Sequence, residues 1–162
     1  MAYKDNYYGG GYNRAPAHTA QGEQRYNREK AKPEPIKAEP IPANYLDKAE
    51  ELMREEKDSI STSKIRRLYS MVTDVYNRER LSTENELSPE STAAIGMMRV
   101  RFAYEAGRDK NVKSFITNAK LMNYLKGIGD SREKFMDFAK YMEALIAYHK
   151  FFGGKENQNN GR

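Results

Sequence analysis

Apolar residues recur every three or four positions from residue 43 onward, and this spacing predicts helices. The longest apolar stripe lies in the last segment, residues 131–157. Its members are Phe135, Phe138, Ala139, Met142, Leu145, Ile146, His149 and Phe152. Asp130 and Glu133 have the spacing of a capping box, and Gly153 can adopt the left-handed conformation that ends a helix. We therefore predict a closing helix of a packed bundle here.

Two helical segments lie at the start of this region. The first fits residues 44–57. The second begins at Ser61 or Thr62, because either hydroxyl suits an N-cap, and it ends before Ser88. Each has its apolar stripe on one side, so we expect each to pack through a single face.

The third segment begins at Ser88, because proline is favoured at the first helical position and Pro89 follows. It extends to about Gly107 and is apolar on two sides, which predicts a central place in a bundle. One side holds Ile95, Met98, Phe102 and Ala106, and the other holds Met97, Val100 and Tyr104. A fourth segment spans residues 110–126. No segment shows the alternation of a strand, so the predicted fold is all-α, a compact bundle of about five helices joined by short loops.

Residues 1–42 have a different composition. A tyrosine- and glycine-rich tract comes first, and the proline-rich stretch KPEPIKAEPIP follows. Such a segment buries too little apolar area to offset the entropy lost on ordering. We expect a disordered N-terminal tail over residues 1–42, one helical domain over residues 43–155, and a disordered C-terminal end over residues 156–162.

Cysteine usage and charge limit the possible classes of protein. The chain has no cysteine, which excludes disulfides and thiolate metal sites and fits a reducing compartment. No apolar run reaches the ~18 residues of a membrane span, and Met1 begins no signal-like stretch, so we expect a cytoplasmic protein without membrane contact. The formal net charge is +5; residues 1–42 hold seven basic and five acidic residues, and the remainder is only mildly basic. The positions of the charges therefore matter more than their total.

Groups that could catalyse a reaction are few. His18 lies in the tail and His149 lies on the packed side of the last helix, where a core histidine is expected. Neither has a metal-ligating partner at helical spacing. The GGGYNR stretch at Gly9 precedes no Lys-Ser pair and is no phosphate loop. We predict no catalytic site, no metal, no cofactor and no enzymatic activity.

The first helix carries a run of acidic residues that alternate with basic ones. The acidic members are Glu50, Glu51, Glu55, Glu56 and Asp58. This alternation is typical of a solvated helix face, and the alternative is a docking surface for a basic neighbour.

Basic residues form stripes on the second and third helices. On the third helix, Arg101 and Arg108 lie seven residues apart on one stripe, and Arg99 lies on the flank of the core side. On the second helix, Lys64 and Arg67 lie together, with Arg66 on the opposite flank. Arginine suits phosphate recognition because its planar fork bonds two oxygens and also stacks on bases.

Two interpretations of the third-helix stripe remain open. In one, its arginines track a phosphate backbone. In the other, Glu105 forms a surface ion-pair ladder, because it lies four residues after Arg101 and three before Arg108.

Three motifs in this order resemble the small helical subunit of type III-A CRISPR interference complexes, the Csm-type effectors. They are SISTSKIRRLYSMV at residues 59–72, MRVRFAYEAGR at residues 98–108 and YMEALIAYHKFFGG at residues 141–154. The resemblance covers about residues 43–155 and not the tail. It implies a non-catalytic subunit that stacks in several copies and binds the backbone of guide RNA and target RNA, in support of target RNA and DNA interference. The implied partners are the repeated backbone subunit, the large polymerase-like subunit and neighbouring copies.

The resemblance puts the RNA contacts on the basic residues of the first two motifs, with Lys113 as a weaker addition. The candidates are Lys64, Arg66, Arg67, Arg99, Arg101, Arg108 and Lys113. Three aromatic residues, Tyr141, Tyr148 and Phe151, either complete the core or dock a second copy. Two alternative functions remain: a helical protein-docking adaptor without direct RNA contact, and a general single-stranded RNA-binding protein that uses the tail.

Overall fold

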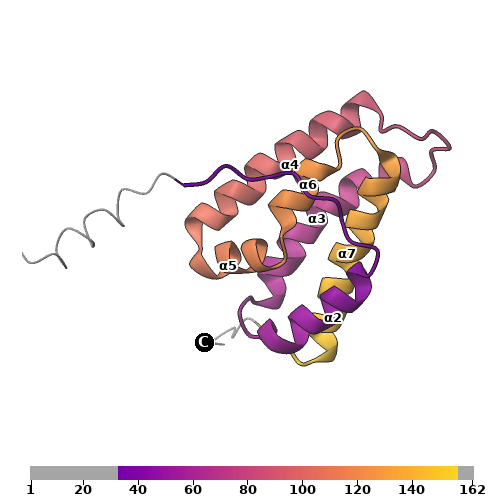
Figure 1. The fold of residues 1–162 in the computed structure, drawn as a ribbon. Coiled ribbons are helices and arrows are strands. Elements are labelled where there is room, and N and C mark those ends of the chain that lie inside the picture. The colour runs from indigo at the N-terminus through magenta and orange to yellow at the C-terminus, as the bar shows by residue number, and fades with distance from the viewer. Residues whose placement is uncertain (1–32, 157–162) are drawn as a thin grey trace, which may run out of the picture. The chain divides into compact units, whose positions relative to one another are not determined.

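The computed structural model describes residues 33–156, and in this part of the chain six α-helices pack together (Figure 1). They are α2 (Tyr45–Glu56), α3 (Thr62–Glu79), α4 (Pro89–Arg108), α5 (Lys110–Asn118), α6 (Leu121–Gly127) and α7 (Arg132–Phe151). The β-type pairing among these residues is one isolated bridge between Glu86 and Ser131. The all-α prediction is confirmed. Most of the predicted disordered tail and the C-terminal end from residue 157 lie outside the described residues.

The helix ends follow the sequence signals in three of four cases. Ser61, one of the two residues predicted to begin the second helix, is the N-cap of α3. The Ser88 Oγ accepts a hydrogen bond from the Ser91 backbone N–H over 3.2 Å and caps α4 as predicted. Gly153 has φ +71° and ends α7, also as predicted. The predicted capping box of α7 is wrong, because Ser131 and not Asp130 is the N-cap, with its Oγ accepting from the Lys134 backbone N–H over 3.4 Å.

The fourth predicted segment, residues 110–126, is two helices and not one. Lys120 interrupts it with φ 52° and ψ 30°, a left-handed conformation that is uncommon for a residue other than glycine. The carbonyl of Ala119, at the end of α5, accepts a hydrogen bond from the Tyr141 hydroxyl over 3.2 Å. The turn allows α5 and α6 to bury their apolar residues separately, which a continuous periodic pattern does not reveal.

The core lies between α7 and the helices around it. The helix α7 packs against α2, α3 and α6, and α4 packs against α3, α5 and α6. Four phenylalanines are fully buried: Phe102, Phe115, Phe135 and Phe138. His149 is 1% exposed, and its Nε2 lies 2.9 Å from the carbonyl oxygen of Ile60, so the predicted core histidine is confirmed. Tyr141 also belongs to the core, whereas Phe151 is 79% exposed.

One apolar side of α4 faces solvent. Met97, Val100 and Tyr104 are 54%, 58% and 64% exposed, while Phe102 on the other side is fully buried. The prediction that both sides are covered is therefore wrong, because the neighbouring helices cover only one. The second side is available as a surface.

Residues 36–42, which we call the strap, lie against α6 although they belong to the predicted tail. The Glu39 backbone N–H donates to the Asn123 carbonyl over 3.1 Å, and the Asn123 side-chain amide donates to the Lys37 carbonyl over 3.0 Å. A Cβ atom at Gly127 would lie 2.1 Å from the Glu39 carbonyl oxygen, so only glycine permits this close approach. The strap is therefore part of the compact unit that begins at Ile36.

Candidate nucleic-acid interface

Glu105 of α4 holds two arginines from different helices. Its Oε2 accepts a hydrogen bond from the Arg67 Nη1 over 3.4 Å, and its Oε1 lies 3.5 Å from the Arg108 Nη1. The Glu105 side chain is 17% exposed, whereas those of Arg67 and Arg108 are 58% and 57% exposed. The carboxylate therefore holds each guanidinium group on the side that faces the protein and leaves most of the N–H donors facing solvent.

Lys64 ties the start of α3 to the junction of α4 and α5. Its Nζ lies 2.5 Å from the Asp109 Oδ2, and the Asp109 Oδ1 accepts from the backbone N–H groups of Asn111 and Val112. The hydrogen bond from Lys64, together with the two backbone bonds, lowers the pKa of Asp109. The single ammonium group of Lys64 is paired and its side chain is 36% exposed, whereas the paired Arg67 is 58% exposed and keeps further N–H donors, so Lys64 is the weakest candidate of the SKIRR motif for phosphate contact.

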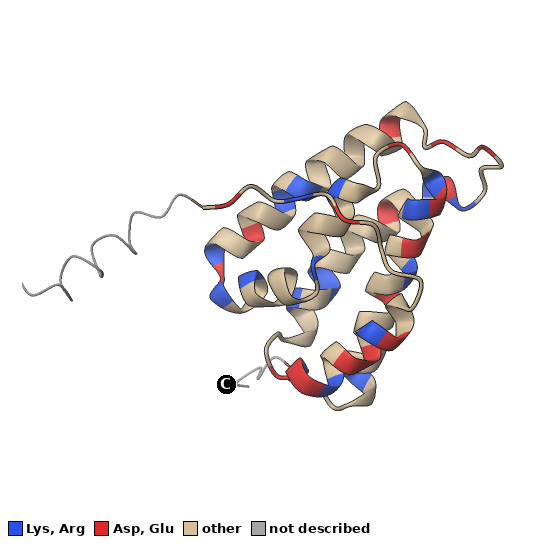
Figure 2. Ribbon diagram, viewed as in Figure 1, with Lys and Arg blue, Asp and Glu red and all other residues tan. Residues whose placement is uncertain are grey.

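Three exposed cations near the same junction make no ion pair with any described residue. They are Arg101 of α4 and Lys110 and Lys113 of α5. Figure 2 shows Lys and Arg gathered where α4 passes into α5. Together with Arg67 and Arg108 they form the surface that we call the basic corner.

Lys110 was missed by the sequence reasoning. It is exposed at the first position of α5, three residues before Lys113 and two after Arg108. That spacing around a helix start was the available signal, because residues three apart on a helix lie on the same side.

The other two candidates lie apart from the Glu105 group. Arg66 is exposed on α3, and its charge acts on Glu156, whose pKa is lowered first by the hydrogen bond from Lys150 and further by Arg66. Arg99 is half-buried, and its Nε is enclosed without a hydrogen-bond partner in the described part of the chain.

The ion-pair ladder predicted as an alternative is present only in part. Glu105 pairs with Arg108 three residues later, but its second partner is Arg67 of α3 and not Arg101. Arg101 is thus left exposed and unpaired among the described residues, because Glu105 pairs with Arg67 and Arg108.

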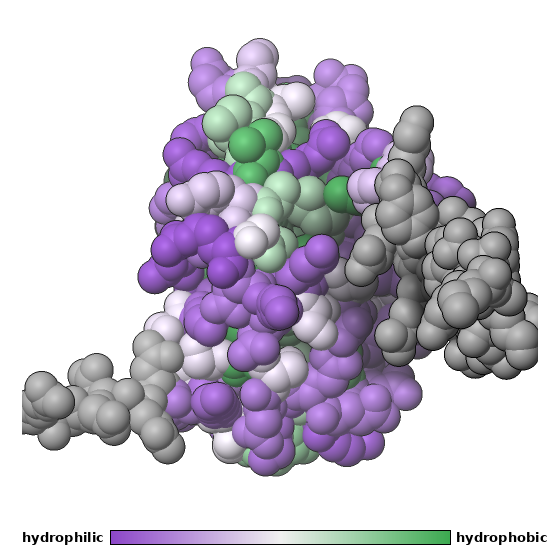
Figure 3. Space-filling view, turned by 90° about the vertical axis from the view of Figure 1, so that its left-hand side faces the viewer, coloured by the Kyte–Doolittle hydropathy of each residue, from purple (hydrophilic) through white to green (hydrophobic). Residues whose placement is uncertain are grey.

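Exposed apolar groups accompany these cations on α4. The Arg108 guanidinium lies 5.4 Å from the centre of the Tyr104 ring, in a cation–π contact. Met97 and Val100 continue the exposed side toward the start of the helix. Figure 3, which faces the side where α4 ends, shows hydrophobic surface bordered by hydrophilic residues. A tyrosine beside an arginine is a combination that suits base stacking next to a phosphate contact.

Within residues 33–156, no group of three or more His, Cys, Asp or Glu side chains is placed to hold a metal ion. None of helices α2 to α7 combines the length and the apolar character of a membrane span.

Known proteins of one family resemble this chain over its helical part. The family described as Csm2 Type III-A matches residues 40–155. The CRISPR system Cms protein Csm2 of Streptococcus thermophilus is 41% identical over 119 residues, which cover 70% of this chain and 94% of that protein. The protein of the same name from Mycobacterium tuberculosis is 38% identical over 97 residues, covering 60% of this chain and 78% of the relative. A third, from Enterococcus italicus, is 32% identical over 97 residues, covering 59% and 69%.

The match extends over the whole helical bundle and includes α3, α4 and α5, which form the basic corner. The chain belongs to the Csm2 family and is a small subunit of type III-A CRISPR complexes.

Proposed function

We propose that this subunit binds the phosphate backbone of guide RNA and target RNA through the basic corner, without catalysing a reaction itself. Several copies stack along the RNA and hold it in place for the subunits that cleave target RNA and DNA. The repeated backbone subunit and the large polymerase-like subunit are the proposed partners. The proposed compartment is the cytoplasm.

The observation that carries the proposal is the way in which Glu105 holds Arg67 and Arg108. A surface ladder made only for solubility needs no partly buried acid, whereas a phosphate site gains from arginines whose direction is already set. The Glu105 side chain is 17% exposed and pairs with one arginine from each of two helices, so both guanidinium groups are held by the same carboxylate. Arg101, Lys110 and Lys113 add charge that no described acid neutralises.

Backbone binding through such groups requires a steep dependence on salt. Each phosphate contact releases counterions, so log Kobs falls linearly with log salt concentration. The test is fluorescence anisotropy of a labelled guide RNA annealed to its target, titrated with the full chain between about 50 and 200 mM salt. We expect affinity to fall as salt rises, with little change when the RNA sequence is scrambled in both strands.

The two alternative functions give different results in the same assay. An adaptor that only docks proteins shows no salt-dependent RNA affinity, and this result would contradict the proposal. A general binder that uses the N-terminal tail loses most of its affinity when residues 1–35 are deleted. Our proposal predicts little loss, because that deletion leaves the strap and the basic corner unchanged.

A further inference from the structure

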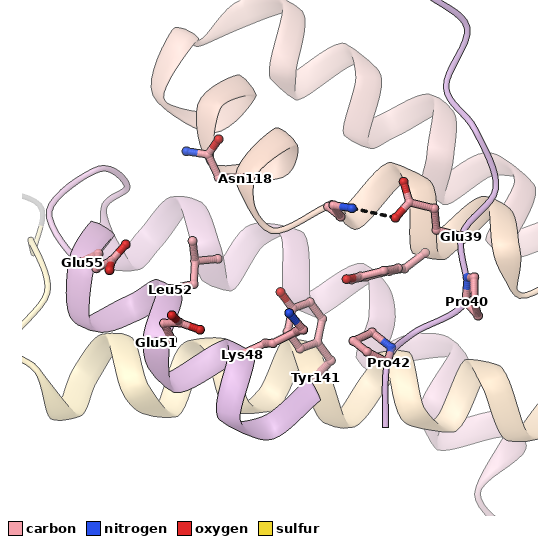
Figure 4. A pocket seen from close by; sticks show the side chains of 11 residues that line it. Glu39, Pro40, Pro42, Lys48, Glu51, Leu52, Glu55, Asn118 and Tyr141 are labelled. Atoms are coloured by element: carbon pink, nitrogen blue, oxygen red, sulfur yellow. Dashed lines mark hydrogen bonds and ion pairs between the residues drawn. The ribbon is translucent and has the colours of Figure 1, made fainter. Parts of the chain in front are cut away.

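A groove of about 370 Å³ lies between the strap, α2 and the turn that joins α5 to α6 (Figure 4). Tyr124, Tyr141 and Leu52 supply its apolar and aromatic lining. Glu51 and Glu55 of α2 also line it, and Figure 4 shows them on consecutive turns of that helix. The groove belongs neither to the basic corner nor to any role proposed above.

Tyr124 lines this groove, and its ring contacts that of Tyr141 at a centroid distance of 5.7 Å. It is 7% exposed, yet its hydroxyl makes no hydrogen bond with any described residue. The hydroxyl of the neighbouring Tyr141 donates to the Ala119 carbonyl over 3.2 Å and is therefore satisfied. The Tyr124 hydroxyl is not enclosed, although the residue as a whole is buried, so a ligand in the groove can reach it and form a hydrogen bond with it.

The charges that line the groove favour a cation. Glu51 and Glu55 are one helical turn apart, a spacing at which like charges repel, and neither makes an ion pair with a described residue. The third carboxylate, that of Glu39, is already paired with Lys120 over 2.7 Å. Among the described residues of the lining, the charges that remain unpaired are then one lysine, Lys48, and two carboxylates, those of Glu51 and Glu55. This balance disfavours an RNA phosphate and favours a basic protein segment.

We infer that this groove binds an arginine side chain of a partner protein, with Glu51 and Glu55 holding the guanidinium and the Tyr124 hydroxyl accepting one of its N–H groups. Arginine fits better than lysine because its planar fork bonds carboxylates, its face stacks on tyrosine, and its stem packs on an apolar residue such as Leu52. Glu39, on the strap, lies just outside the part of the chain matched to the Csm2 family.

The test uses the full chain labelled with ¹⁵N and the probe acetyl-Gly-Arg-Gly-amide. The control probe contains citrulline in place of arginine, which has nearly the same shape without the charge. We expect the arginine peptide to shift backbone amide signals of residues 39, 48–55 and 118–124, and the citrulline peptide to bind at least tenfold more weakly.

Three variants make the test specific. Glu51→Gln/Glu55→Gln is expected to remove the arginine-induced shifts, and Tyr124→Phe is expected to weaken binding about threefold while the fold is retained. Glu84→Gln/Glu86→Gln changes the net charge equally on the exposed loop after α3 and should leave binding unchanged.

Several outcomes would overturn the inference. These are equal binding of both peptides, shifts that persist in Glu51→Gln/Glu55→Gln, or shifts confined to other surfaces. If the groove signals move only with protein concentration, the occupant is a second copy and not a basic segment of another protein. None of these outcomes depends on RNA binding, so the proposed function stands or fails separately.

Discussion

Arg67 of α3 donates a hydrogen bond to Glu105 of α4 over 3.4 Å and so links the two helices that carry the predicted RNA contacts. The same carboxylate lies 3.5 Å from Arg108. One acid therefore sets the direction of two exposed arginines, and its removal separates a positioning role from a purely electrostatic one.

Replacing Glu105 by glutamine tests this positioning role. The change removes a negative charge near the proposed RNA surface, so a purely electrostatic effect would raise RNA affinity. We expect affinity to fall, because the two guanidinium groups lose their common acceptor. The free energy of unfolding should decrease by roughly 1 kcal/mol at most, since the partners are more than half exposed.

The comparison uses Glu84→Gln, which makes the same charge change on an exposed loop residue. Anisotropy titrations and chemical unfolding of both variants give the two quantities. An affinity for Glu105→Gln that rises as much as that of Glu84→Gln, or more, would rule out the positioning role.

The environment of Glu79 leads to a prediction of how the free energy of unfolding depends on pH. It is 2% exposed, and the Ser88 hydroxyl donates to its Oε1 over 2.9 Å. Burial alone would raise the pKa of Glu79, but the hydroxyls of Ser91 and Ser88 and the charge of Arg132 outweigh it and lower the pKa. A lowered pKa contributes stability that is complete above the unfolded-state pKa, about 4.3, and is lost as pH falls through the folded-state pKa.

The measurement is urea unfolding of wild type and Glu79→Gln from neutral pH to about pH 3. We expect Glu79→Gln to be less stable by roughly 1 to 3 kcal/mol near pH 7, because a charged acceptor of a buried network is lost. The difference should shrink as pH falls below the unfolded-state pKa. A difference that stays constant with pH would show that the Glu79 charge makes no contribution.

Adding a single methyl group at Gly154 is expected to have a large effect on stability. A Cβ atom there would lie 2.4 Å from the Nε2 of His149, which is buried against Ile60. Since the ring has no room to move, Gly154→Ala should destabilise the fold by about 1 to 3 kcal/mol.

The matched control is Gly96→Ala within α4. Apart from the neighbouring residues and the backbone of α4 itself, no atom lies within 4 Å of the Cβ position at Gly96, so alanine should stabilise the helix by about 0.5 to 1 kcal/mol. Thermal melts of both variants therefore shift in opposite directions. A Gly154→Ala protein that melts at or above the wild-type temperature would show that the His149 packing described above is incorrect.

The helices were predictable wherever a local signal marks their ends. Ser88 and Pro89 identify the start of α4 from residue type alone, and Gly153 identifies the end of α7. The break at Lys120 was not predictable, because lysine carries no preference for the left-handed conformation and the contacts of Ala119 with Tyr141 come from a distant helix. The apolar stripe simply continues through the turn.

The site was predictable in its residue types but not in its pairings. The spacing of Arg101, Glu105 and Arg108 fits both a ladder and a phosphate-binding stripe. Which arginine pairs with Glu105 depends on how α3 packs against α4. The sequence does not show that this packing brings Arg67 next to Glu105. The exposure of Met97 and Tyr104 could not be predicted either. The sequence pattern of an apolar helix side is the same whether or not another helix covers it.

The most direct test of the central claim is the salt dependence of RNA binding by Arg101→Ala/Arg108→Ala. Each lost phosphate contact lowers the salt slope by about 1, so we expect the slope to decrease by about 2, with the melting temperature near that of wild type. The control, Arg78→Ala/Arg80→Ala, removes equal charge at the other end of α3, where both arginines are exposed, and should keep the wild-type slope. An unchanged slope in Arg101→Ala/Arg108→Ala, or an equal decrease in both variants, would contradict RNA binding at the basic corner.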